Sequence, residues 1–425
     1  MDAAGASRVV TGTRWAVLGV CTLGTALAYV HRLGLAPLLP AVIGDLGVSD
    51  TAAGVLVTAY FWTYIAVQLP VGVLTDGVGA RRTMLASLGV LLLGVLVFPL
   101  AGSLAAAIAA RGLVGLGAAG LWLPSLRLIR EWFPAGERGR AVGLCSAGGG
   151  VGGTAALVLL PALAETLGWR SAYAVTAGPV LAMLALTLWL IRPGPLAGDG
   201  GPPGGGRAGS GLGEVLAHRA LWPLALASLA SYAGFVALVS WLPALLVREA
   251  GVTAGTAGVI TSLLTVGTML SWPLGGYLSD RLGRRRGVYL VSLALGAGAG
   301  GGLAASVAAA GVAASAALAL ATGLALGGMV TPFYVAAAVF PARLTGTVAG
   351  VVNTFWLLGG VVGPALVGRV LDLTGSAALG LGTCAALLVL ALGAAAGIRE
   401  PEPRGPGTGR GLSASACARP SGKRQ

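Results

Sequence analysis

Long apolar runs alternate with short polar segments along this chain. A membrane-spanning helix needs about 20 mainly apolar residues, and twelve runs reach that length. They lie near 15–38, 52–74, 83–102, 104–128, 140–164 and 171–191 in the first half, and near 220–246, 254–278, 288–308, 311–338, 345–370 and 376–397 in the second. The pattern predicts an all-α membrane protein with twelve transmembrane helices. The first run is too long for the apolar core of a cleavable signal peptide.

Two polar segments divide the chain further. The stretch 192–219 contains GPLAGDGGPPGGGRAGSGLGE, a composition typical of flexible linkers. The stretch 398–425 is rich in Pro, Gly, Ser and Arg, and we expect it to be a disordered tail. The predicted order is an N-terminus (1–14), a six-helix bundle (15–191), the linker, a second six-helix bundle (220–397) and the tail.

The composition agrees with this reading. Hydrophobic residues make up 56% of the chain and charged residues 10%, and the mean hydropathy is +0.88. Soluble proteins carry roughly 25% charged residues. The 72 glycines fall largely within apolar runs, where small residues let membrane helices approach closely. The four cysteines are scattered without ligand spacing, so we expect no metal and no cofactor.

The net charge of +13 raises the question of a nucleic-acid partner, and its distribution answers it. Most basic residues fall in the N-terminus, in alternate loops and in the tail, whereas the opposite loops hold few, such as Arg170, Arg248 and Arg369. This asymmetry is the positive-inside pattern of membrane proteins. We expect no nucleic acid, a cell inner (plasma) membrane location, and both termini on the cytoplasmic side.

A short motif closes the second predicted span and recurs 204 residues later at the end of the eighth. The first copy runs from Gly72 through Asp76 to Arg81 and Arg82 (GVLTDGVGARR), and the second reads GYLSDRLGRRR from residue 276. A repeat of this kind implies two similar bundles around a central pathway, with the binding site near the middle of the bilayer.

Both copies resemble the signature loop of the major facilitator superfamily, G-x-L-x-D-R-x-G-R-K/R-K/R. The second copy matches almost throughout, and the first departs at Gly77 and Ala80. The resemblance covers about 14–397 and implies a monomeric carrier whose loops hold the cytoplasmic side shut in one state. The arginines could instead be simple positive-inside anchors. The gating residues implied are Gly72, Asp76, Arg81, Arg82, Gly276, Asp280, Arg281, Arg284 and Arg285.

Charged side chains inside a span are costly and point to function. The acidic residues that can be placed lie at span ends or in loops, which leaves His31, Arg32 and Arg111 as the intramembrane candidates. The Arg32 fork suits a carboxylate, and organic-anion branches of the family have an arginine at a similar place. Alternatively, Arg32 extends to the outer surface. His31 titrates near neutral pH and is a candidate proton carrier; Arg111 could bind substrate, relay protons or bind backbone carbonyls.

Aromatic and amide side chains in the predicted spans are candidates for lining the pathway. Amphipathic aromatics offer a ligand both apolar area and hydrogen bonds, although many sit in the interface belts of a membrane instead. The candidates are Tyr60, Tyr64, Trp122, Tyr232, Asn353 and Trp356.

Together these features predict a secondary active transporter of a small organic anion, with protons as a candidate coupling ion and the lipid bilayer as its surroundings. The alternative is a proton-driven exporter of amphipathic or drug-like compounds. The glycines of the fifth span (148–150, 152 and 153) favour that alternative, but the proline of the antiporter pattern is missing. An enzyme is disfavoured because the histidines are His31 and His218 and no acid lies mid-span. An ATP-driven pump is disfavoured because the chain has no phosphate-binding G-x-x-x-x-G-K-[ST] loop.

Overall fold

The computed structural model describes residues 3–398, except for 193, 196–211, 283 and 342–343. The described chain is almost entirely helical and contains no strand. The predicted tail, beyond Ile398, and most of the predicted linker lie outside the described residues.

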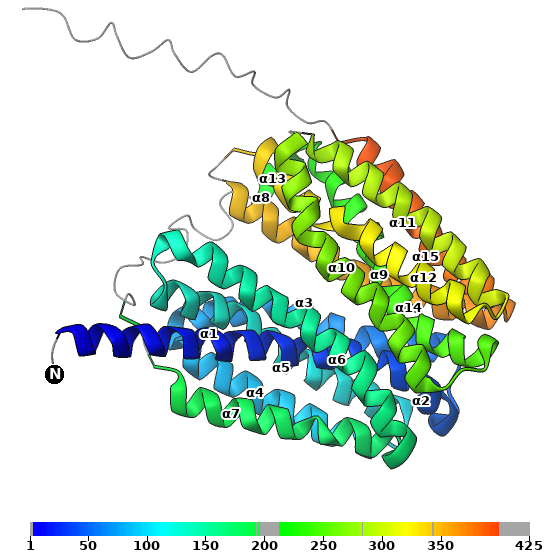
Figure 1. Ribbon diagram of the computed structural model, residues 1–425, viewed down its shortest axis with the longest axis horizontal. Coiled ribbons are helices and arrows are strands. Elements are labelled where there is room, and N and C mark those ends of the chain that lie inside the picture. Colours follow the sequence, from blue (N-terminus) through cyan, green and yellow to red (C-terminus); the bar gives the residue numbers. More distant parts are fainter. Residues whose placement is uncertain (1–2, 193, 196–211, 283, 342–343, 399–425) are drawn as a thin grey trace, which may run out of the picture.

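Figure 1 shows two sets of helices packed side by side. The first set runs from blue to green and the second from green to orange. The N-terminal half contains α1 (Ala3–Leu33), α2 (Leu39–Leu46), α3 (Asp50–Val78), α4 (Ala80–Val97), α5 (Leu104–Trp132), α6 (Ala135–Val175) and α7 (Ala177–Leu190), with short 3-10 turns at Ala36–Leu38 and Phe98–Leu100. The C-terminal half contains α8 (Leu212–Ala217), α9 (Leu221–Ala250), α10 (Ala254–Leu282), α11 (Arg285–Ala308), α12 (Val312–Ala325), the 3-10 turn Leu326–Val330, α13 (Thr331–Val339), α14 (Thr345–Thr374) and α15 (Ala377–Ala396).

Eleven segments of the described chain are long and apolar enough to cross a membrane. One of them, Gly136–Leu190, has 55 residues, about twice the length that one crossing needs. Its backbone turns at Gly168, where φ is +75°, a conformation that glycine adopts without a steric penalty. This segment therefore holds two of the predicted spans, and the prediction of an all-α fold with twelve spans is confirmed.

Short turns with well-formed caps lie at one end of the molecule, which we call the gate end. Ser49 accepts a hydrogen bond from the Ala52 amide at the start of α3, and Ser376 does the same for Leu379 at the start of α15. Such side-chain caps satisfy the free amides of a helix start. Gly251 and Gly375 end α9 and α14 in the left-handed conformation, the usual helix stop. The opposite end, where α7 ends, α9 begins, and α3 and α10 end, we call the linker end.

Glycines bring the helices of each half into close contact. A Cβ on Gly152 of α6 would lie 2.0 Å from the Ala26 carbonyl oxygen of α1, and one on Gly323 of α12 would lie 2.1 Å from the Leu264 carbonyl oxygen of α10. Close approach of this kind is how helices pack tightly within a bilayer. The glycine-rich runs therefore form the contacts inside each half.

The two halves meet along α3 with α14 and along α6 with α10. A Cβ on Gly54 of α3 would lie 2.7 Å from the Pro364 carbonyl oxygen of α14. A Cβ on Gly258 of α10 would lie 2.1 Å from the Leu157 carbonyl oxygen of α6. Both contacts lie toward the gate end, so the halves are tightly apposed there.

Candidate substrate site and gate

Arg32 lies in the last turn of α1 and is only 6% exposed. Its guanidinium carbon is 4.5 Å from the ring centroid of Tyr29, 4.9 Å from that of Tyr64 and 5.7 Å from that of Tyr60. Phe61 is the fourth ring of this group, at 5.8 Å. Aromatic faces attract cations at these distances. Arg32 is thus held inside the molecule, and its side chain does not extend to the outer surface.

Aromatic rings continue from Arg32 across the boundary between the halves. Phe61 packs edge-on against Tyr232 of α9, with ring centroids 6.4 Å apart, and Tyr232 lies 3.9 Å from Trp356 of α14. The Trp356 ring in turn lies 6.4 Å from Trp272 of α10 and 6.0 Å from Phe333 of α13. We call this set the aromatic cluster; its members are Tyr29, Tyr60, Phe61, Tyr64, Tyr232, Trp272, Phe333 and Trp356.

Three of the predicted lining residues, Tyr60, Tyr64 and Tyr232, lie next to Arg32, and a fourth, Trp356, packs against Tyr232. Asn353 is partly buried one turn from Trp356 on α14, and Trp122 is partly buried in α5. Among the described residues, neither of these two side chains makes a hydrogen bond or ring contact with Arg32. The sequence reading missed Tyr29, Phe61, Trp272 and Phe333. Of these, only Tyr29 carried a usable signal, because it lies three residues before Arg32 on the same helix face.

His31 and Arg111 form a second buried group inside the N-terminal half. Arg111 has no exposed surface; it donates one hydrogen bond to the His31 carbonyl oxygen at 2.9 Å and another to the Tyr173 hydroxyl at 3.1 Å. The Tyr60 ring lies 5.4 Å from the Arg111 guanidinium carbon and 5.7 Å from that of Arg32. Among the described residues neither arginine has a carboxylate partner. The interior of this half therefore carries two cations without a resident acid.

Carboxylates connect the two halves at the gate end. Asp372, near the end of α14, accepts hydrogen bonds from the Asp50 and Thr51 amides at the start of α3, at 2.9 and 2.8 Å. Glu165 of α6 accepts one from the Gly255 amide at the start of α10, at 2.9 Å. A negative group at a helix start also interacts favourably with the helix dipole. Arg248 of α9 adds two hydrogen bonds to Asp50, both of 2.9 Å.

At the linker end, the contacts of three predicted gating residues, Asp76, Arg81 and Arg281, stay within their own halves. Asp76 lies 3.6 Å from Arg127 of α5, and Arg81 donates to the Leu188 carbonyl oxygen of α7 at 2.7 Å. Arg281 donates to the Tyr277 hydroxyl of its own helix at 3.4 Å. The remaining predicted residues are placed as follows: Arg82 and Arg284 are exposed, Gly276 and Arg285 are partly buried, a Cβ on Gly72 would meet only Leu123 of its own half, and the side chain of Asp280 lies outside the described residues.

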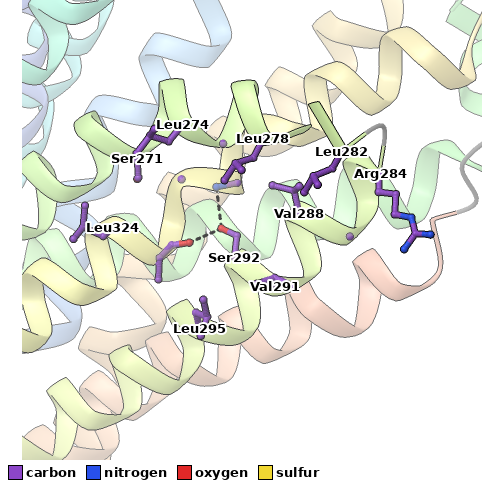
Figure 2. Close-up of a pocket in the computed structure, with 15 residues that line it drawn as sticks. Ser271, Leu274, Leu278, Leu282, Arg284, Val288, Val291, Ser292, Leu295 and Leu324 are labelled. Atoms are coloured by element: carbon purple, nitrogen blue, oxygen red, sulfur yellow. Dashed lines mark hydrogen bonds between the residues drawn. The ribbon is translucent and has the colours of Figure 1, made fainter. Parts of the chain in front are cut away.

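A cavity of about 480 Å³ opens between α10 and α11 near the linker end. Figure 2 shows leucines and valines along both walls, with Arg284 at one end. The Ser292 hydroxyl in this cavity donates to the Ala325 carbonyl oxygen and accepts from the Gly328 amide. Its lining is apolar and includes no member of the aromatic cluster, so it offers little to a polar solute.

These features define a class of protein. The chain has twelve apolar spans in two halves, a buried cationic site where the halves meet, and a set of contacts that join the halves at one end. This combination is that of a membrane carrier.

The chain matches the sequence model of the Major Facilitator Superfamily over residues 21–255 and 244–419, and it belongs to that family. It is 24% identical to a probable sulfoacetate transporter of Cupriavidus necator, over 89% of this chain and 94% of that protein. It is 25% identical to a D-galactonate transporter of Escherichia coli, over 84% and 88% of the two chains. A solved bacterial homologue of the lysosomal transporter Spinster, in an inward-facing and occupied conformation, superimposes with a TM-score of 0.76 at 20% identity, over 90% and 95% of the two chains.

The family assignment confirms the predicted class. The protein is a multi-pass membrane transporter of a small-molecule substrate and not an enzyme, and its surroundings are the lipid bilayer.

Proposed function

We propose that this protein carries a small organic anion with a carboxylate group across the cell inner membrane, and that Arg32 binds that carboxylate. The observation that supports this most is the buried Arg32 guanidinium, which has no acidic partner among the described residues, at the junction of the halves. A buried charge is stable only when it is paired, and the guanidinium fork matches a carboxylate. The named relatives transport sulfoacetate and galactonate, which is consistent with an anionic substrate.

Transport proceeds by alternating access, with the 15–191 and 220–397 bundles rocking about the site in a monomer. The basic linker end faces the cytoplasm together with both termini, and the gate end faces outward. The space around three glycines supports an inward-open arrangement, in which the halves are apart at the linker end. A Cβ on Gly360 of α14 would meet the Phe61 ring at 2.6 Å, whereas Gly143 of α6 and Gly350 of α14, nearer the linker end, would meet nothing within 4 Å.

When the gate end opens, the linker end closes. The two repeated motifs then approach the opposite half, and Asp76 and Asp280 cap helix starts there, as Asp372 and Glu165 do at the gate end now. Helix starts favour a negative group. The loop arginines Arg81, Arg82, Arg281, Arg284 and Arg285 pair with acids across the interface in that state, and Gly72 and Gly276 allow the close helix contact.

Proton coupling proceeds through His31. Both of its ring nitrogens are buried without a hydrogen-bond partner among the described residues, and its ring packs 5.9 Å from Tyr173. Arg111, which donates a hydrogen bond to the His31 carbonyl oxygen, places a fixed positive charge next to this residue. A bound carboxylate neutralises part of that positive field, so substrate and proton enter together. The variant His31→Gln should still exchange substrate but should no longer concentrate it on an imposed pH gradient; full accumulation would contradict this role.

Uptake into proteoliposomes tests whether Arg32 binds the substrate carboxylate. The panel contains organic acids and their neutral amides. Arg32→Gln should lower uptake of every transported acid by at least about tenfold, because a charged hydrogen-bond partner is lost. Arg32→Lys should retain part of it, since it keeps the charge without the fork. Arg219→Gln, at an exposed position beside α9, is the matched control and should leave uptake unchanged. Undiminished transport of all acids by Arg32→Gln would disprove the proposal.

A further inference from the structure

We infer that the substrate is an aromatic monocarboxylate with hydrogen-bond acceptors on its ring, and not a polyhydroxylated sugar acid. This inference rests on the proposed function and adds the chemistry of the rest of the substrate. It follows from three features of the site: the number of reachable cations, the walls around them, and the polar atoms those walls offer.

Of the two buried guanidinium groups in the described N-terminal half, Arg32 is the one that faces the boundary between the halves. Arg111 is completely buried, and it is bound to the His31 carbonyl oxygen and the Tyr173 hydroxyl. The Tyr60 ring is close to both guanidinium groups and is itself fully buried. Arg32 faces the aromatic rings that cross to the C-terminal half. A single reachable cation favours a substrate with a single negative charge.

The wall opposite Arg32 is made of aromatic rings. Tyr232, Trp272, Phe333 and Trp356 come from α9, α10, α13 and α14, and each of the first three packs against Trp356. Flat rings bind flat apolar surfaces through stacked and edge-to-face contacts. A sugar acid would place several hydroxyl donors against these rings, where each unpaired donor is costly.

The buried polar atoms in the cluster and on Arg32 that lack a partner among the described residues are donors. The indole N–H groups of Trp272 and Trp356 and the Nε of Arg32 are buried without a hydrogen-bond partner among the described residues. Buried polar groups are nearly always paired, and unpaired ones call for an explanation. An indole nitrogen can only donate. One or two acceptor oxygens on a flat ring, as in a hydroxyl, ether or carbonyl group, satisfy them, and a single ring hydroxyl brings one donor where a sugar acid brings several.

Two assays test the inference. Ligand binding to the purified full chain is measured by tryptophan fluorescence, and competition for uptake is measured in proteoliposomes. The probes are benzoate, 4-hydroxybenzoate, cyclohexanecarboxylate and glucuronate. We expect the two benzoates to bind at least about tenfold more tightly than glucuronate and more tightly than cyclohexanecarboxylate, which is apolar but not flat. 4-Hydroxybenzoate should bind more tightly than benzoate.

Trp356→Phe separates stacking from hydrogen bonding, because it keeps a ring and removes the N–H. It should weaken 4-hydroxybenzoate binding about three- to tenfold, the value of one hydrogen bond, and leave benzoate within about twofold. Trp189→Phe, at a position 75% exposed on α7, is the matched control and should change neither. Glucuronate binding as tightly as the benzoates would overturn the inference and leave the proposed function standing. If no carboxylate in this panel or the wider acid panel binds, the proposed function fails as well.

Discussion

At the scale of single residues, the contacts of Arg111 show how a buried cation is held without an acid. Its hydrogen bonds go to a carbonyl oxygen and to the Tyr173 hydroxyl. Hydrogen bonds to charged groups contribute more than neutral ones. We predict that Tyr173→Phe lowers stability by about 2 kcal/mol, measured as a fall in melting temperature in detergent.

Tyr289 provides the matched comparison for that prediction. Its hydroxyl is equally buried, but it is hydrogen-bonded to the neutral Ser231 hydroxyl at 3.1 Å. Tyr289→Phe should therefore cost only about 1 kcal/mol. Equal losses for the two variants would show that the Arg111 charge adds nothing to its hydrogen bond.

The sequence revealed the charged residues of the site better than the aromatic ones. His31, Arg32 and Arg111 stand out because charges are rare in membrane spans, and all three are buried in one region of the structure. Trp272 and Phe333 do not stand out, because an aromatic residue in an apolar run fits equally well in a core, a membrane interface or a binding site. Their role depends on contacts across α10, α13 and α14, which no local pattern encodes.

At the scale of helices, glycine positions separate contact surfaces from open ones. Gly152 of α6 faces the backbone of α1, where an added Cβ would lie 2.0 Å from a carbonyl oxygen, whereas Gly143 of the same helix faces open space. We predict that Gly152→Ala destabilises the protein by about 1–3 kcal/mol through overpacking. Gly143→Ala should be neutral or stabilise it by up to about 1 kcal/mol, because alanine is the better helix former.

Thermal unfolding of both variants in the same detergent checks this prediction. The result that contradicts it is a Gly143→Ala variant at least as unstable as Gly152→Ala. In that case α6 and α1 would have to separate easily, and their close packing would not limit stability.

Run length and hydropathy were sufficient to predict the membrane helices, because the bilayer sets the length that each must have. The details that differed depend on backbone geometry. The first helix begins at Ala3, before the apolar run, and the predicted tenth span is divided into α12, a 3-10 turn and α13. That turn contains Gly327, where an added Cβ would lie 2.5 Å from the Ser271 carbonyl oxygen of α10. The break therefore permits a helix contact that hydropathy cannot reveal.

At the scale of the whole molecule, the gate repeats the internal symmetry of the chain. Glu165 and Asp372 are 207 residues apart, and the amide donors at Gly255 and Asp50 are 205 apart, close to the 204-residue offset of the repeated motif. Each half therefore supplies a carboxylate to the helix start of the other. The sequence reading placed these acids at span ends but could not pair them, because their partners are backbone amides that any residue provides.

This reciprocity leads to a prediction about the conformational equilibrium. Asp372→Asn removes the negative charge beside the start of α3, and an amide can no longer accept from both backbone donors with both of its polar atoms. The group is exposed, so the effect is moderate; we predict a shift toward the gate-open state of about two- to fivefold. Spin labels at Gly102 and Ala309, one in each half near the gate end, measure this shift toward the gate-open state. The expected result is a larger fraction of long distances between the two labels. Glu137→Gln breaks an ion pair with Arg14 inside one half and should leave that distribution unchanged. If both variants shift it equally, loss of an acid alone explains the change, and the gate contacts do not hold the halves together.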